Sequence, residues 1–405
     1  MRDPSRVRVP GPLEPYAEGF RGELAGQGYS PGAAAVQLQV MGHLSGWLAG
    51  RGLDSAGLTS ALVDAYLAER RRLGCASHWT RRGVAPLLGF LRRQQAAPAA
   101  ATPAPVGPVE ALLGRYARWL AAERGLAERT IRRNVELVRP FLEGRDSGGG
   151  MTLEDLRAAD VTAFVVGRCQ DARGGTAPRM MTSLRSLLGF LHVEGLIDQP
   201  LAAVVPPMAT WKLAGVPKAL DDGQAAALLA SCDQDTAVGR RDLALLTVLV
   251  RLGLRASEAA ALRLGDIDWR RGELVVHGKG NRHDRLPLPA DVGQAIVAWL
   301  TAGRPNTTAG DGREVFVRVR APRQALTRGA VTQVVARAGV RAGLGPIYAH
   351  RLRHTAATGM LRAGGSLVEI GQVLRHQRPL TTAIYAKVDI AALRPLARRW
   401  PAGAA

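Results

Sequence analysis

The chain has 405 residues, with 54 lysines and arginines against 34 aspartates and glutamates, and its formal net charge of +20 predicts a polyanionic partner. A chain of this length allows two or three domains. No stretch is long and apolar enough to span a bilayer, and the N-terminal residues carry charges and prolines where a secretion signal needs an apolar run, so we expect a cytoplasmic protein without a membrane partner.

Two segments rich in proline and small residues divide the chain. Residues 96–108 form an Ala/Pro linker that we expect to be extended. A second break, over residues 201–217, precedes a helical pattern that opens at Asp221. We therefore predict an N-terminal helical unit over residues 1–95, a middle helical unit over 109–200 and a C-terminal domain over 218–405.

The first two units share short sequence segments. VDAYLAER, from Val63, parallels VTAFVVGR, from Val161, and LLGFL occurs at both Leu87 and Leu187. A repeat spacing of about 100 residues indicates a duplicated helical unit, although two short matches in an Ala- and Leu-rich chain also arise by chance. The sequence leaves open whether the N-terminal unit contacts DNA or protein.

The middle unit contains a basic helical face. Apolar residues recur at helical spacing over residues 116–144, which leaves Arg129, Arg132 and Arg133 on the outer side. Such a face is either simply solvated or, beside nucleic acid, in contact with phosphates. The sequence alone keeps both alternatives.

In the C-terminal domain, helical patterns over residues 221–264 lead into a β-hairpin and then into further helices. The hairpin reads ELVVHG, a Gly/Asn turn that holds Lys279, and RLPLP. Near the turn, Arg282 and Arg285 are either phosphate contacts or solvated charges, and we expect His277 and His283 to be exposed. Aromatic residues make up only 5% of the chain, which favours duplex backbone contacts over a stacking platform for single strands.

Polar residues suited to phosphodiester chemistry are concentrated in this domain. If the residues from 350 onward are helical, His350 and Arg353 share a face. Arginine forks match phosphate oxygens and stay charged, so Arg353 and Arg255 can neutralise a pentacoordinate phosphorus without a metal. His350 and His376 add donors or proton acceptors near neutral pH.

Two further side chains complete this chemistry. Lys279, on its hairpin turn, can give a proton to a departing 5′ oxygen. Tyr385 supplies a nucleophile, which stays weak until it is activated because an unperturbed phenol has a pKa of about 10.

The sequence does not favour a metal site or a disulfide framework. His354 follows His350 by four residues, a spacing that binds zinc on helices. Two nearby arginines would repel a dication, so we favour a structural role for His354. Three cysteines, Cys75, Cys169 and Cys232, are far apart in the sequence. We expect neither a metal nor a cofactor.

The order Arg, Lys, His-x-x-Arg, His, Tyr, at these spacings, resembles the tyrosine recombinase family, also called the phage integrase family. One departure is Arg375, in an LRH sequence where many members read LGH, and it places a helix-end cap in doubt. The resemblance implies a residue that braces the site at Glu258 and catalytic roles for Arg255, Lys279, His350, Arg353, His376 and the nucleophile Tyr385.

The resemblance also implies a fold and an activity. The fold is mainly α, with N-terminal helical SAM-like DNA-binding units and an α-rich catalytic domain with a small antiparallel sheet. The activity is that of a site-specific recombinase or integrase that cuts and rejoins double-stranded DNA through a 3′-phosphotyrosyl intermediate. We expect four protomers on two DNA sites, and a monomer or dimer off DNA.

Two alternatives stay open. A type IB-like topoisomerase uses the same chemistry to relax DNA. A non-catalytic DNA-binding regulator explains the charge but not Tyr385.

Overall fold

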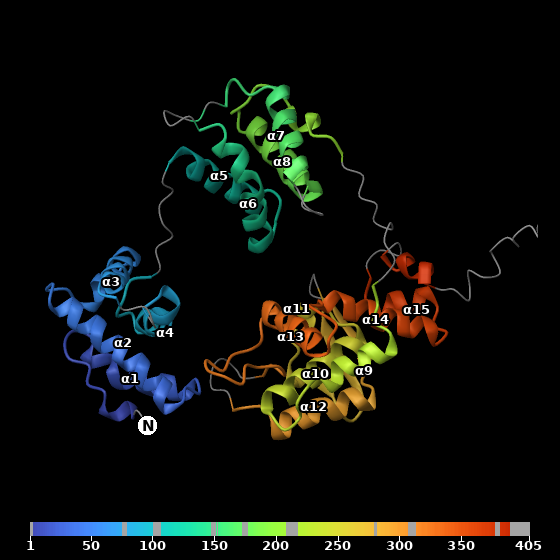
Figure 1. The fold of residues 1–405 in the computed structure, drawn as a ribbon. Helices are drawn as coiled ribbons and strands as arrows, with labels where there is room; N and C mark the ends of the chain where they lie inside the picture. The colour runs from blue at the N-terminus through green and yellow to red at the C-terminus, as the bar shows by residue number, and fades with distance from the viewer. Residues whose placement is uncertain are drawn as a thin grey trace, which may run out of the picture. The chain divides into compact units, whose positions relative to one another are not determined.

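The computed structural model describes residues 3–74, 79–99, 107–146, 151, 153–171, 177–207, 218–278, 282–306, 313–376 and 381–388. By their internal contacts, residues 101–212 form one compact unit, and residues 1–100 together with 213–405 form the other. The described elements are mainly helices, with one small antiparallel sheet (Figure 1). The predicted fold class is therefore confirmed, whereas the predicted three-domain boundaries stay a prediction.

The described residues of the N-terminal segment pack around their own hydrophobic core. Three of its four described α-helices begin after hydroxyl side chains: Ser30, Thr59 and Thr80 each accept a hydrogen bond from a backbone amide of the first turn. In the core, the rings of Phe20 and Phe90 lie 5.2 Å apart at 39°. The helices are α1 (Ala17–Gly26), α2 (Pro31–Ala49), α3 (Ser60–Arg72) and α4 (Arg81–Arg93), with 3-10 turns at Pro4–Arg6, Glu14–Tyr16 and Ser55–Gly57.

The unit over residues 101–212 has a similar set of described helices. Tyr116 packs on Phe190, with ring centroids 5.4 Å apart at 48°. Arg129, Arg132 and Arg133 are exposed on one of these helices, as predicted. The elements are α5 (Pro108–Ala122), α6 (Glu128–Glu143), α7 (Ala158–Asp171), α8 (Ala177–Val193) and a 3-10 turn at Leu201–Val204.

The segments that recur in the sequence lie on corresponding helices of these two groups. The Val63 segment begins within α3 and the Val161 segment within α7. The LLGFL segments at Leu87 and Leu187 lie in α4 and α8. An aromatic pair joins the first and last helix in each group at nearly the same separation. This correspondence favours the predicted duplication.

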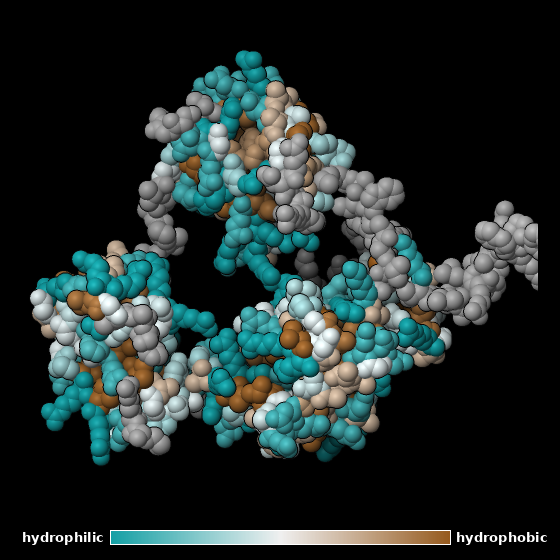
Figure 2. All heavy atoms as spheres, in the orientation of Figure 1, coloured by the Kyte–Doolittle hydropathy of each residue, from teal (hydrophilic) through white to brown (hydrophobic). Residues whose placement is uncertain are grey.

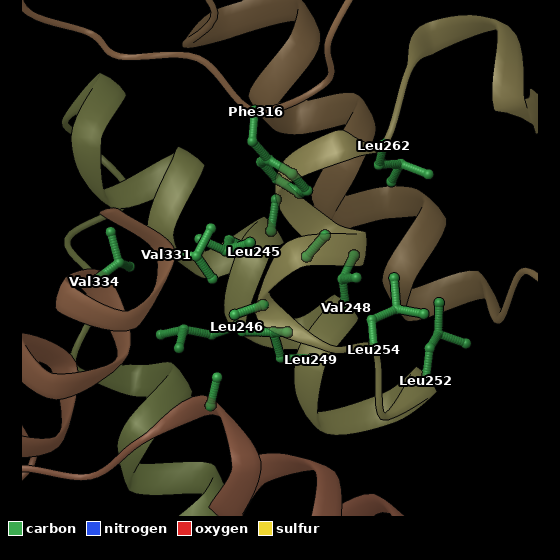
Figure 3. Packing of buried hydrophobic residues seen from close by; sticks show 14 of the residues in the cluster. Leu245, Leu246, Val248, Leu249, Leu252, Leu254, Leu262, Phe316, Val331 and Val334 are labelled. Atoms are coloured by element: carbon green, nitrogen blue, oxygen red, sulfur yellow. The ribbon is translucent and has the colours of Figure 1, made fainter. Parts of the chain in front are cut away.

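The C-terminal segment is built around α10, whose buried side chains form the centre of a large hydrophobic cluster. Figure 3 shows Leu245, Leu246 and Leu249 among residues of neighbouring elements, including Phe316 and Val331. The elements are α9 (Asp222–Ala230), α10 (Ala237–Leu252), α11 (Ala256–Ala261), a 3-10 turn at Leu264–Asp266, β1 (Ile267–Asp268), β2 (Glu273–His277), β3 (His283–Pro287), α12 (Ala290–Ala302), α13 (Arg328–Arg341), α14 (Ala349–Arg362), α15 (Leu367–Val373) and the 3-10 segment η7 (Ala383–Val388).

The sheet is the predicted hairpin extended by one short strand. Its order is β1-β2-β3, and β2 pairs antiparallel with β3 so that His277 lies opposite His283. Alternate residues Leu274, Val276 and Leu286 are buried, as expected for a sheet with one face on the core. The turn that carries Lys279 lies outside the described residues.

A glycine ends α10 and sets the direction of the chain toward α11. Gly253 has a φ of +59°, which favours glycine. A Cβ there would lie 2.6 Å from Cδ2 of Leu374 and 3.2 Å from Cβ of Ala356. The turn therefore needs glycine for its conformation and for space.

The surface visible in Figure 2 is largely polar. Figure 2 shows hydrophilic side chains over most of the visible face of each part, with smaller apolar patches between them. Over the described ranges, every helix is too short or too polar to cross a membrane.

Candidate active site

Helix α14 carries three of the residues that form the site. It begins at Ala349, one residue before the predicted start, and bears His350, Arg353 and His354. Arg353 is only 2% exposed and donates hydrogen bonds from Nη1 to the Gly253 carbonyl at 2.6 Å and from Nη2 to the Leu374 carbonyl. The end of α10 and the end of α15 are thus tied to this guanidinium.

Electrostatics around Arg353 favour an anion. Burial, together with repulsion from Arg255 and Arg375, lowers the pKa of Arg353 to about 10. The guanidinium remains charged at neutral pH. Bringing in a phosphate would relieve the repulsion between these cations.

Arg255 lies at the N-terminus of α11, immediately after the Gly253 turn. Its amide donates to Oε2 of Glu258 at 2.8 Å, and its Nη1 donates to Oε1 of the same carboxylate at 2.5 Å. The side chain is still 44% exposed, so an incoming anion can reach it.

Glu258 is the buried carboxylate that connects Arg255 with Arg375. It is 6% exposed, and its Oε2 accepts a hydrogen bond from Nη2 of Arg375 at 2.7 Å. Burial alone would raise the pKa of Glu258, but Arg375 and Arg255 outweigh burial and leave the pKa below its usual range. Glu258 therefore stays ionised and holds both arginines.

The helix-end cap that the sequence placed in doubt is formed at Arg375. It follows α15 with a φ of +57°, and its amide donates to the Gln372 carbonyl at 2.9 Å. The His376 amide donates to the Gly371 carbonyl at 2.9 Å, so the two bonds form the cap that usually has glycine at this position. The cap is kept despite the missing glycine, and the arginine side chain turns back to Glu258.

His376 follows this cap and packs against Tyr385. Its Nδ1 lies 2.7 Å from Oγ1 of Thr382, and its ring stacks on that of Tyr385 at 6.5 Å and 5°. Burial, followed by repulsion from Arg353 and Arg255, lowers the pKa of His376 to about 4. His376 is therefore neutral at physiological pH.

Tyr385 lies in η7 with its ring buried against α14 and α15. It is 1% exposed, and its hydroxyl oxygen lies 3.0 Å from Nδ1 of His354. Burial raises the pKa of Tyr385, an effect that Arg353 partly opposes.

His350 and His354 form a ring pair along α14. Their centroids are 4.4 Å apart at 70°. Partial burial, Arg353 and Arg255 lower the pKa of His350. Burial, His350 and Arg353 lower the pKa of His354 to about 4. Both rings thus favour the neutral form, which offers one nitrogen as an acceptor.

The structure brings most of the predicted site residues together. Arg255, Glu258 and Arg353 are connected to His376 and Tyr385 through the contacts above. Lys279 lies outside the described residues, so its distance from this group stays a prediction. Within the described ranges, no group of three or more metal-ligating side chains occurs.

The residues that flank the Lys279 turn are described. Nε2 of His277 lies 2.7 Å from Oδ1 of Asp266, and the rings of His277 and His283 are 4.6 Å apart. Arg282 and Arg285 are exposed, and Arg285 is 3.6 Å from a Glu273 oxygen.

Sequence reasoning missed two interactions. His354 was expected to be structural, yet it touches the Tyr385 hydroxyl, and its place one turn after His350 was the available signal. Arg375 stood in the sequence only as a departure from a glycine pattern, and no sequence signal indicated its ion pair with Glu258.

Known proteins similar to this chain are integrases and recombinases. Residues 218–391 match a family model described as the Phage integrase family. A putative integrase/recombinase of Sinorhizobium fredii is 39% identical over 398 residues, which cover 96% of this chain and 95% of that protein. Tyrosine recombinase XerD of Xanthomonas axonopodis pv. citri is 34% identical over 301 residues, covering 71% of this chain and 94% of that protein.

Solved structures share the fold. A XerH site-specific recombinase bound to a palindromic difH substrate covers 72% of this chain and 96% of its own length, with a TM-score of 0.56 and 18% identity. A lambda integrase (75–356) dimer bound to a COC′ core site covers 72% and 97%, with a TM-score of 0.54 and 18% identity.

Proposed function

Because the chain belongs to the phage integrase family, we propose that Tyr385 is the nucleophile with which it cuts and rejoins duplex DNA. The protein is a site-specific tyrosine recombinase, an enzyme that breaks and rejoins DNA strands. One observation carries the proposal: α11, α14, η7 and the residues after α15 bring a tyrosine hydroxyl, neutral histidines and several arginines close together.

In the proposed reaction, Arg255 and Arg353 bind the scissile phosphate. Their guanidinium groups stabilise the negative charge that grows on the phosphoryl oxygens as phosphorus becomes five-coordinate. Arg255 is accessible and held by Glu258, and the buried Arg353 is oriented by two backbone carbonyls. Fixed donors of this kind need little reorganisation during the reaction.

The covalent step forms one bond and breaks another. The Tyr385 oxygen bonds to phosphorus while the bond from phosphorus to the 5′ oxygen breaks, which leaves a 3′-phosphotyrosyl link. We assign Lys279 as the donor of the proton to the departing 5′ oxygen. A 5′-hydroxyl of a partner strand then attacks the link and releases Tyr385, so the phosphodiester energy is retained.

The histidines complete the proposed site. His350 lies beside the arginine pair and hydrogen-bonds a phosphate oxygen in the proposal. His376 stacks on Tyr385 and holds the segment that carries the nucleophile. Glu258 braces Arg255.

The partner is double-stranded DNA, in line with the charge of +20 and the DNA-bound recombinases that share the fold. We further propose that four protomers assemble on two DNA sites in the cytoplasm. The middle unit would contact the DNA backbone through Arg129, Arg132 and Arg133, and Arg282 and Arg285 would do so beside the hairpin.

A suicide substrate with a nick next to the cleavage site tests the nucleophile, because the short leaving strand diffuses away and traps the covalent product. We expect the wild type and Tyr16→Phe to form a protein–DNA adduct, and Tyr385→Phe to form none. Adduct from Tyr385→Phe at the wild-type level would rule out this nucleophile.

Two further DNA assays distinguish recombination from the alternative functions. Strand exchange between two DNA sites is expected of a recombinase, whereas plasmid relaxation without exchange would favour type IB-like topoisomerase activity. DNA binding without any adduct would favour a non-catalytic regulator.

A further inference from the structure

One histidine contacts the proposed nucleophile directly. Nδ1 of His354 lies 3.0 Å from the Tyr385 hydroxyl oxygen, and the two rings are 5.5 Å apart at 64°. This distance is within the range of about 2.6–3.2 Å in which a general base can take a proton. His350, one turn earlier on the same helix, packs against His354 with ring centroids 4.4 Å apart.

We propose that His354 is a further catalytic residue, which accepts the proton of the Tyr385 hydroxyl as its oxygen attacks the scissile phosphorus. This inference rests on the proposed role of Tyr385 as nucleophile. It assigns the proton acceptor to the second histidine of the His-x-x-Arg-His sequence, and leaves His350 as a donor to the phosphate.

The protonation state of His354 suits this role. The charged and titratable groups that face it are His350 and Arg353 on its own helix and Tyr385 on η7. Burial and these two α14 neighbours keep the imidazole neutral at physiological pH. With the ring proton on Nε2, the Nδ1 lone pair points to the phenol and accepts its hydrogen bond.

The same surroundings keep the tyrosine inactive in the absence of DNA. Burial raises the pKa of Tyr385 while it lowers that of His354, so proton transfer is uphill in the DNA-free chain. A phosphodiester bound by Arg255 and Arg353 would add negative charge next to the imidazole. That charge favours the imidazolium form, so DNA binding itself makes His354 a stronger base.

The step balances in protons and electrons. The O–H bond of Tyr385 breaks, and its proton goes to the Nδ1 lone pair of His354. The freed oxygen lone pair forms the bond to phosphorus, and the electrons of the breaking P–O bond stay on the 5′ oxygen, which Lys279 protonates. In rejoining, the imidazolium returns the proton to the departing phenolate.

The position of His354 on α14 links the base to the phosphate site. Arg353 is the preceding residue, so the base and this arginine lie on the same helix. The hydroxyl oxygen has lone pairs enough to face phosphorus while it donates its proton to His354.

Two substitutions test the proposal on the nicked suicide substrate under single-turnover conditions. In His354→Asn, an amide oxygen in place of Nδ1 keeps a hydrogen-bond acceptor but cannot take a proton at neutral pH. His354→Phe keeps an aromatic ring and loses the acceptor. We expect both variants to form adduct on the order of 100-fold more slowly at pH 7, with DNA binding unchanged.

The pH profile separates proton transfer from positioning. Without a base, hydroxide must generate the phenolate, so the deficit of His354→Asn is expected to shrink as pH rises from 7 to 9. A deficit that stays constant over this range would assign only positioning to His354 and overturn the proposal.

Controls keep the outcome unambiguous. His192→Asn, at an exposed histidine of α8, should cleave at the wild-type rate. Wild-type or faster cleavage by His354→Asn would overturn the proposal and show that the contact merely restrains the tyrosine. Adduct formation by Tyr385→Phe would instead refute the proposed nucleophile. If His354→Phe unfolds, the Asn variant decides.

Discussion

At the scale of single residues, the site contains one buried carboxylate among three arginines. Glu258 accepts hydrogen bonds from Arg255 and Arg375, while Arg353 is held by backbone carbonyls. The excess positive charge is stable because Arg255 remains in contact with water. In the proposed reaction, the scissile phosphate would supply the missing negative charge.

The accessible arginine provides the first prediction. Arg255→Ala removes a donor to the transition state, and we expect cleavage to fall on the order of 100-fold or more. The matched control is Arg251→Ala, which removes an exposed arginine paired with Asp291 at the end of α10. Single-turnover cleavage and DNA affinity are measured together, and a loss explained wholly by weaker binding would contradict the assigned role.

A second prediction concerns the ion pair of Arg375 with Glu258. Arg375→Gly suits the left-handed backbone but removes the ion pair with Glu258, so we expect a folded protein that cleaves about 10-fold more slowly, as when an orienting partner is lost. Gln95→Gly makes the same backbone change at a φ of +56° after α4. Equal cleavage rates in the two variants would show that the ion pair does not position Arg255.

At the scale of elements, the candidate site depends on how α10 ends. The turn at Gly253 directs the chain to Arg255, and its carbonyl orients Arg353. This turn thus connects Arg255 and Arg353, which lie 98 residues apart in the sequence (353 minus 255).

Gly253→Ala tests this turn. We expect a loss of about 2 kcal/mol or more in the free energy of unfolding, because the added methyl group meets Leu374 in addition to the strain of the left-handed backbone. Gly343→Ala, at a φ of +74° with open space around its Cβ position, measures the strain alone. Urea unfolding compares them, and equal losses would exclude the steric contribution.

The enclosure formed by α14, α15 and η7 also sets a pH dependence. The pKa values of His354 and His376 fall from 6.5 to about 4 on folding, so the unfolded chain binds more protons between these values. Stability is therefore fully present above the unfolded pKa and is expected to decline as pH falls from 6.5 toward 4.

Urea unfolding at pH 8, 6.5 and 5.5 measures this decline. A variant with His354→Asn and His376→Asn should show a smaller loss between pH 8 and 5.5 than the wild type does. An unchanged pH slope would indicate that other groups cause the acid sensitivity.

At the scale of the whole molecule, charge governs DNA binding. With a net charge of +20, affinity should fall linearly with salt on logarithmic axes. Replacing Arg129, Arg132 and Arg133 with glutamine should weaken binding and reduce the slope by about 0.9 for each phosphate that the protein no longer neutralises. Filter binding at several salt concentrations measures the slope, and an unchanged slope would mean that these exposed side chains remain solvated.

The sequence by itself determined the fold class and the hairpin, and it predicted the candidate site residues. These predictions rest on signals that can be read along the chain without coordinates. The signals are the apolar periodicity, the turn residues and the order of Arg255, His350, Arg353, His376 and Tyr385. The described hairpin strands and the exposed arginines of α6 agree with those predictions.

Only the tertiary structure decided which side chains touch. The hydrogen bond between Tyr385 and His354 and the ion pair between Arg375 and Glu258 join residues 31 and 117 positions apart. Their formation depends on how α11, α14, α15 and η7 pack, and burial among these elements shifts the pKa values. Neither the distances between these side chains nor the local dielectric surroundings are encoded in the spacing of residues along the chain.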